Sequence, residues 1–284
     1  RKNADLPVLT GPTDSMHLQY RRTVATARNP IRKFKAMVKW GLFIRYQLQI
    51  LNRMQHLLVV AEKDARSMKR FSPRVNIHVV PNGVNVDYLA PPNNNQRIPT
   101  RLVFLGTLGK GSTNEHSLVW FLKAVWPKIQ KTNSDASLEI IGPHPSDTLS
   151  KIVAACRNVQ LLGFVEDIRP PLWRAGIFVL PMQSGAGIKN KLLEAWAAGC
   201  VVISTPLGIE GVSHAKSADN ILVASNPEQF AGFINHSLEE PESIIRIAQA
   251  GQDTVHRFYR WESVVGQLEQ IFIRIASEYS CKNK

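Results

Sequence analysis

The chain has few cysteines and no long apolar run. Its 284 residues include three cysteines, Cys156, Cys200 and Cys281, which lie far apart and form neither a disulfide framework nor a metal-binding spacing. This usage favours a reducing compartment, and we expect a cytoplasmic protein. No apolar run reaches the roughly 18 residues that a membrane-spanning helix needs. The eight histidines show no metal-ligand spacing, so the sequence does not support a metal centre.

Acidic residues are missing from one long stretch. Residues 1–90 contain 16 Lys and Arg against 5 Asp and Glu, whereas residues 91–284 contain 19 against 17, so the net charge of +13 belongs mainly to the first third. Between Arg21 and Arg53 there are nine basic residues and no acidic one. Such a stretch attracts anionic lipid head groups, phosphorylated acceptors or nucleic acid. Aromatic residues are too sparse in it to predict a nucleic-acid platform, so we expect no nucleic-acid partner.

Apolar residues recur at helical spacing from about Pro30 to Met54, within this basic stretch. The pattern predicts an amphipathic helix with a basic outer face. Two interpretations stay open. The helix packs on a sheet, which we prefer, or residues 21–53 hold the protein at an anionic membrane surface, on the inner face of the membrane.

Three nucleotide-related motifs are absent. No Gly-x-x-x-x-Gly-Lys-Ser/Thr run occurs, which argues against a P-loop ATPase. Gly109-Lys-Gly111 opens like a dinucleotide fingerprint, but its third glycine would fall at Asn114, which argues against a dehydrogenase. No Asp-x-Asp pair occurs, so we expect neither a metal ion nor a cofactor.

The segment of the sequence that most indicates a function runs from Pro181 to Gly199. A short strand pattern precedes it and the apolar run Cys200–Ser204 follows it, so it predicts a strand, a glycine loop, a helix and a second strand. Such a loop lies at the carboxyl end of a strand, where the helix amino terminus binds phosphate groups. Lys189 and Lys191 add cations there, and Glu194 could accept hydrogen bonds from a ribose. The alternative is an ordinary tight loop followed by an exposed Lys191–Glu194 pair.

The same alternation of strands and helices continues along the chain. Glycine turns end several strands, and helical patterns follow them, which predicts an α/β fold with a doubly wound parallel sheet. The segment Pro91 to Pro99, with three asparagines, predicts a linker between two domains. We expect strands at the following ranges: 6–10, 56–61, 76–80, 101–105, 137–141, 158–162, 176–180, 200–204 and 220–223.

Five segments in order resemble glycosyltransferase family 4, also described as glycosyl transferases group 1. They are Pro81–Asn85, the glycine loop that begins at Gly106, Gly163–Asp167, Pro181–Gly199 and Phe258–Trp261. The resemblance implies a GT-B fold, in which two Rossmann-like domains face each other across a cleft. It implies a partial N-terminal acceptor-side domain at 1–92 and a donor-binding domain at 100–258. A final helix at 259–284 would either cross back to the first domain or pack within the second.

The resemblance also implies roles for individual residues. Glu194 corresponds to the second carboxylate of a Glu-x7-Glu pattern and would bind the donor ribose, while Lys191 and Lys189 would stabilise the diphosphate. The first carboxylate of that pattern would stand at Ala186, which is a departure from the family. The other expected donor-binding residues fall into three groups. Gly106 and Lys110 lie in the first loop, and Phe164 and Val165 would line the pocket for the nucleotide base. The glycine loop contributes Gly185, Ala186, Gly187 and Ile188.

The activity that the resemblance implies is a hexosyl-type transfer in polysaccharide biosynthesis. A retaining, metal-independent enzyme would move a sugar from a UDP- or GDP-linked donor to a carbohydrate or lipid-linked acceptor. The alternative is a nucleotide-sugar-binding fragment without turnover, because the N-terminal domain is expected to be incomplete.

Overall fold

The computed structural model describes residues 8–11, 16–26, 29–185 and 187–282, and these form two parallel β-sheets with helices packed against them. The smaller sheet has the strand order β1-β2-β3, with all pairs parallel. Its strands are β1 (Leu9–Thr10), β2 (His56–Val59) and β3 (Asn76–Val79). Leu6 and Pro7, the first two residues of the predicted strand 6–10, lie outside the described residues.

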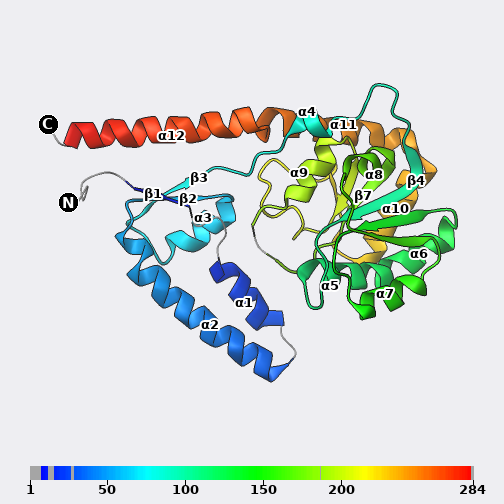
Figure 1. The fold of residues 1–284 in the computed structure, drawn as a ribbon, viewed down its shortest axis with the longest axis horizontal. Helices are drawn as coiled ribbons and strands as arrows, with labels where there is room; N and C mark the ends of the chain where they lie inside the picture. The colour runs from blue at the N-terminus through cyan, green and yellow to red at the C-terminus, as the bar shows by residue number, and fades with distance from the viewer. Residues whose placement is uncertain (1–7, 12–15, 27–28, 186, 283–284) are drawn as a thin grey trace.

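Three helices accompany the smaller sheet, and together they form what we call the N-terminal unit (Figure 1). They are α1 (Met16–Thr26), α2 (Pro30–Gln49) and α3 (Glu62–Lys69), with a short 3-10 turn at Leu51–Arg53 before β2. The core of the unit is small. It consists of Leu51, Leu57, Val59, Met68 and Val75.

The larger sheet carries six parallel strands in the order β6-β5-β4-β7-β8-β9. The strands are apolar along most of their length because helices cover both faces of the sheet. They are β4 (Ile98–Leu105), β5 (Ser137–Ile141), β6 (Val159–Gly163), β7 (Ala175–Leu180), β8 (Val201–Ser204) and β9 (Leu222–Val223). Numbered along the chain, this is the 3-2-1-4-5-6 order of a Rossmann sheet.

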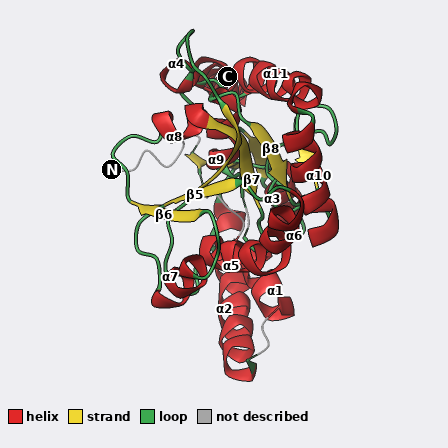
Figure 2. Cartoon of the chain, turned by 90° about the vertical axis from the view of Figure 1, so that its right-hand side faces the viewer, coloured by secondary structure: helices red, strands yellow, loops and turns green. Residues whose placement is uncertain are grey.

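Helices lie on both faces of this sheet and complete the C-terminal unit (Figure 2). One face buries a core around Phe121, Trp126 and Phe230, and the other buries a core around Trp196 and Tyr259. A π-helical turn (Phe121–Val125) joins α5 and α6, so the helical segment from Thr113 to Thr132 is not uniform. The helices are α5 (Thr113–Trp120), α6 (Trp126–Thr132), α7 (Asp147–Ala154), α8 (Arg169–Arg174), α9 (Asn190–Ala197), α10 (Pro227–Glu239) and α11 (Pro241–Phe258).

The chain crosses between the two units twice, and the crossings lie side by side. Val84 forms a parallel β-bridge with Arg260, and its amide donates to the carbonyl oxygen of Tyr259 at 2.8 Å. A Cβ atom at Gly83 would lie 2.5 Å from the Trp261 ring, so only glycine fits there without displacement. The short helix α4 (Val86–Leu89) then leads into the C-terminal unit.

The last helix, α12 (Trp261–Lys282), extends from the second crossing along the N-terminal unit (Figure 1). Arg274 of this helix lies 3.3 Å from the Nδ1 atom of His78 in β3. Val264 and Ile275 are buried, as an apolar stripe requires, but Val265 and Phe272 are 54% and 51% exposed. Part of the apolar surface of α12 is therefore exposed. Among the described helices, none has the length and apolar character needed to cross a bilayer.

Candidate functional site

The sheet has its topological switch point between β4 and β7, and we call the place at their carboxyl ends the crevice. These strands are neighbours, but the chain leaves β4 toward α5 on one face and leaves β7 toward α9 on the other. Loops that diverge in this way open a space at the carboxyl end of the sheet, which is where open α/β sheets bind ligands. The two loops that border the space are 106–112 and 181–189.

Glycines allow the first loop to approach its neighbours closely. The Gly106 amide donates to the carbonyl oxygen of Ile141 at 2.9 Å. A Cβ at Gly142 would lie 2.0 Å from the carbonyl oxygen of Gly106, and a Cβ at Gly106 would lie 2.5 Å from the ammonium nitrogen of Lys191. A side chain at position 106 would therefore displace the side chain of Lys191, which lies at the start of α9.

The second loop needs glycine for a different reason. Gly185 and Gly187 have φ angles of 121° and 68°, which side-chain-bearing residues rarely adopt. The ammonium group of Lys189 donates to the Gly187 carbonyl oxygen at 2.8 Å, and the Gln183 amide donates to the Ser117 hydroxyl oxygen at 3.1 Å. These bonds hold the loop between α5 and the start of α9.

Lys191 is the central cation of the crevice. Its ammonium group donates to the Asn114 side-chain carbonyl at 2.6 Å and lies 4.7 Å from the centroid of the Phe104 ring. The pKa of Lys191 is lowered to about 7, first by burial and then by the charge of nearby Lys189, while Glu194 acts in the opposite direction. The neutral Asn114 side chain compensates a desolvated ammonium group poorly, so an anion in the crevice would be attracted to it.

Glu194 lies one turn further along α9 and is half-buried. Burial raises the pKa of its carboxyl group, while the charge of Lys191 acts to lower it. The exposed Lys191–Glu194 pair of the alternative interpretation is not what the structure contains, because both side chains lie in a desolvated place.

The other predicted site residues lie at different depths. Lys189 is buried, Ile188 and Val165 are half-buried, Lys110 is exposed, and Phe164 is 72% exposed. The Phe164 side chain is therefore open to solvent, and its role at the nucleotide base stays a prediction. Ala186 lies outside the described residues.

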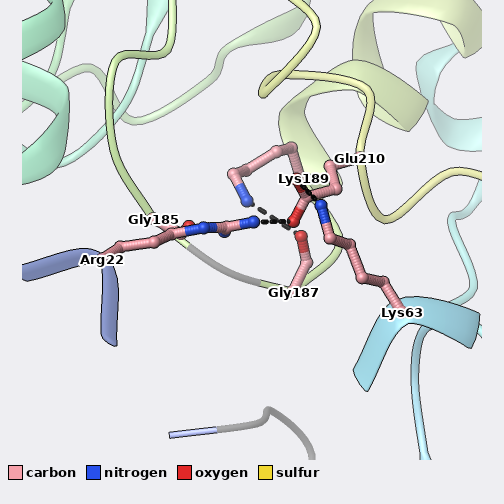
Figure 3. A network of polar contacts seen from close by, with 6 residues as sticks. All are labelled: Arg22, Lys63, Gly185, Gly187, Lys189 and Glu210. Carbon is pink, nitrogen blue, oxygen red and sulfur yellow. Dashed lines mark hydrogen bonds and ion pairs between the residues drawn. The ribbon is translucent and has the colours of Figure 1, made fainter. Parts of the chain in front are cut away.

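Several residues of the crevice were missed by sequence reasoning. Asn114, which accepts the hydrogen bond from Lys191, lies in the first turn of α5 and carries no sequence signal beyond its place just after the first loop. From the N-terminal unit, Arg22 and Lys63 reach Glu210 and the glycine loop (Figure 3). Their only signal was the excess of positive charge in the first ninety residues.

Comparison with known proteins identifies the family. The family model described as "Glycosyl transferases group 1" matches residues 99–240, which is half of the chain and contains both loops. An "Uncharacterized 44.6 kDa protein in cps region" from Klebsiella pneumoniae is 31% identical over 144 residues, covering 48% of this chain and 37% of the relative.

Solved structures are similar in fold. Sucrose-phosphate synthase from Thermosynechococcus elongatus matches with a TM-score of 0.74 and 15% identity over 95% of this chain and 68% of that one. Anabaena Alr3699/HepE in complex with UDP and glucose matches with a TM-score of 0.67 and 14% identity over 82% of this chain and 66% of that one. The predicted α/β fold of GT-B type is confirmed. Because the family model matches half of the chain, including both loops of the crevice, the chain belongs to the glycosyl transferases group 1 family.

Proposed function

We propose that the crevice between β4 and β7 binds a nucleotide diphosphate sugar and that the protein transfers this sugar to an acceptor hydroxyl. The observation that carries the proposal is the buried ammonium group of Lys191, which Asn114 holds beside two glycine loops. UDP is the first nucleotide to test because the Anabaena structure contains UDP and glucose. GDP is the alternative base.

The proposed chemistry is electrostatic. As the bond between the anomeric carbon and the β-phosphate oxygen breaks, the diphosphate takes the electron pair and gains negative charge. Lys191, Lys189 and the amino terminus of α9 stabilise that charge, so they bind the transition state more tightly than the donor. The acceptor oxygen forms the new bond to the anomeric carbon and passes its proton to the departing β-phosphate oxygen. Glu194 binds the ribose hydroxyls.

A titration with UDP and GDP tests the donor site. We expect one nucleotide to bind, and we expect Lys191→Met and Glu194→Gln to weaken binding by about tenfold or more, as loss of a hydrogen bond that involves a charged group would. Lys151→Met and Glu239→Gln change exposed residues of the same unit and serve as controls. Unchanged affinity in both site variants would contradict the assignment of the site.

Transfer itself needs a separate measurement. We propose a retaining, metal-independent reaction of hexosyl type with a carbohydrate or lipid-linked acceptor, as in family 4 and in polysaccharide biosynthesis. The cps-region name of the Klebsiella relative supports this last point. NMR of the product should show the anomeric configuration of the donor, and excess EDTA should leave the rate unchanged. Donor binding without transfer to any acceptor would favour the nucleotide-sugar-binding module instead.

The outer surface of α2 supports a membrane-associated location in the cytoplasm. Four apolar side chains of one stripe along the helix are between 46% and 67% exposed. They are Ile31, Phe34, Val38 and Leu42. Exposed basic residues flank them, and residues 21–53 contain no acidic side chain. Such a face matches an anionic lipid surface in both charge and apolar character.

Sedimentation with phospholipid vesicles tests this location. The protein should pellet with vesicles that contain phosphatidylglycerol and stay in solution with pure phosphatidylcholine. Phe34→Ser and Leu42→Ser together should reduce pelleting without changing nucleotide affinity. Equal pelleting of the double variant would refute insertion of the apolar stripe.

A further inference from the structure

A group of charged residues from the N-terminal unit lies beside the glycine loop. Arg22 on α1 donates hydrogen bonds to the carbonyl oxygen of Gly185 and to the carboxylate of Glu210. Lys63 on α3 donates to the other carboxylate oxygen of Glu210 at 2.6 Å. Figure 3 shows these side chains meeting next to Lys189. Two cations of the N-terminal unit therefore stand at the wall of the proposed donor site.

Glu210 belongs to the segment after β8 and is held against the same loop. A Cβ atom on its neighbour Gly211 would lie 2.5 Å from the Cα atom of Ile188 and 2.7 Å from the carbonyl oxygen of Gly187. Residues 210–211 thus pack directly on residues 187–188. The contacts of Arg22 and Lys63 are made at the loop that precedes α9, and not at a remote part of the interface.

The charges of this group do not balance. Arg22, Lys63 and Lys189 bring three positive charges, and Glu210 brings one negative charge. Burial alone would raise the pKa of Glu210, but hydrogen bonds from Arg22 and Lys63 outweigh that effect and lower the pKa, so the carboxylate is ionised at neutral pH. The side chains of Arg22 and Glu210 are only 22% and 18% exposed, whereas that of Lys63 is 47% exposed, so water screens the Arg22–Glu210 contact less than it screens Lys63.

We infer that Arg22 and Lys63 are donor-binding residues that contact the diphosphate of the nucleotide sugar, with Glu210 as the counter-ion that they exchange for the phosphate oxygens. The inference rests on the proposed function, since it extends the same site. A dianionic diphosphate carries one more negative charge than the carboxylate that it would replace, and the contact of Arg22 with the Gly185 carbonyl oxygen already places its guanidinium group at the loop. Both units would then have to be close together for full donor affinity.

The competing explanation is a permanent ion pair that only holds the two units together. The two explanations differ in the effect of Glu210→Gln. If Glu210 is an exchangeable counter-ion, its neutralisation frees two cations and removes a negative charge beside the phosphates, so UDP affinity stays equal or increases. If Glu210 is a structural tie, its neutralisation weakens UDP binding as the loss of Arg22 does.

Titration calorimetry with UDP and UMP tests the inference. We expect Arg22→Gln to raise the Kd for UDP by about tenfold or more and Lys63→Met to raise it by a smaller factor, with a smaller effect of each on UMP. Glu210→Gln should bind UDP at least as tightly as the wild type. Arg21→Gln and Arg66→Met alter exposed basic neighbours on the same two helices and should leave the Kd unchanged.

The outcomes separate this inference from the proposed function. Wild-type UDP affinity in Arg22→Gln and Lys63→Met, together with its loss in Lys191→Met, would overturn the inference and leave the donor site intact. Weakening by Glu210→Gln equal to that by Arg22→Gln would also overturn it. If the wild type binds neither UDP nor GDP, the proposed function and this inference fail together.

Discussion

Lys191 combines a charged group with a desolvated position. Its ammonium group has an acceptor in Asn114 and an aromatic face in Phe104, yet burial holds its pKa at about 7. The residue is thus close to half-protonated near neutral pH in the free protein, and a bound diphosphate would favour the charged form. Binding and protonation of Lys191 should therefore be coupled.

This coupling predicts proton uptake when UDP binds. At pH 8 the free lysine is mostly neutral, and the bound one is charged, so binding should take up close to one proton from the buffer. Nucleotide affinity should accordingly fall as the pH rises above about 7. Calorimetry in Tris and HEPES, which have different ionisation enthalpies, measures the uptake, and Lys191→Met should abolish it. Equal binding enthalpies in both buffers would contradict the pKa assigned to Lys191.

Gly106 carries a second prediction at the scale of one residue. The Cβ of Gly106→Ala would lie 2.5 Å from the Lys191 nitrogen and 2.8 Å from the Asn114 side-chain nitrogen. The flexible end of the lysine can move away, so we expect UDP binding to weaken by about tenfold with little change in melting temperature. Gly232→Ala, which meets no atom within 4 Å, is the control. Wild-type affinity in Gly106→Ala would argue against Lys191 as a ligand of the phosphates.

At the scale of elements, α12 is attached to the smaller sheet through a pair of histidines. Arg274 can only donate, so His78 accepts at Nδ1 and donates from Nε2 to Nδ1 of His56, 3.1 Å away. This arrangement requires the His78 imidazole to be neutral, because its Nδ1 atom accepts a hydrogen bond. The pKa of His78 is lowered by burial first, then by His56 and Arg274, against the opposing charge of Glu278. Lys69 lines the same hollow.

Protonation of His78 at low pH should therefore weaken the attachment of α12 to the smaller sheet. The folded state holds His78 neutral at pH values where the unfolded chain binds a proton, so the contact loses stability as the pH falls below about 6.5. Limited proteolysis at pH 7.5 and pH 5.5 should show faster cleavage within α12 at the lower pH. His78→Gln keeps a polar side chain without titrating and should reduce the difference. Cleavage of the wild type at one rate at both pH values would contradict the role of the histidines.

At the scale of the whole molecule, the paired crossings at Val84 and Arg260 set how the two units face each other. Gly83→Ala would bring a Cβ to 2.5 Å from the rigid Trp261 ring, so one crossing must shift. If Arg22 and Lys63 bind the diphosphate, the shift should weaken UDP binding and enlarge the radius of gyration in small-angle scattering. Gly266→Ala, with open space on α12, is the control. Unchanged scattering and affinity in Gly83→Ala would show that the crossings do not determine the arrangement.

Much of the larger sheet could be predicted from the sequence because its signals are local. A strand such as Gly176–Leu180 is a continuous apolar run, and glycine turns mark where the chain reverses. The loop at Gly185 and Gly187, the two lysines and Glu194 are close in sequence, so their shared position at the start of α9 followed from helical geometry. The α2 helix was expected for the same reason, but the choice between packing on a sheet and facing a membrane stayed open, since a helical pattern does not say what covers its apolar stripe.

The sequence by itself determined the alternating strands and helices, the glycine loops and the family, since each rests on residues close together in the chain. The tertiary structure decided what depends on residues far apart. Asn114 and Lys191 meet across the switch point between β4 and β7, and Arg22 and Lys63 reach Glu210 from another unit. Burial also arises only on packing, so the pKa of Lys191 and the charge imbalance at the loop follow from the folded molecule, where water no longer compensates the charges.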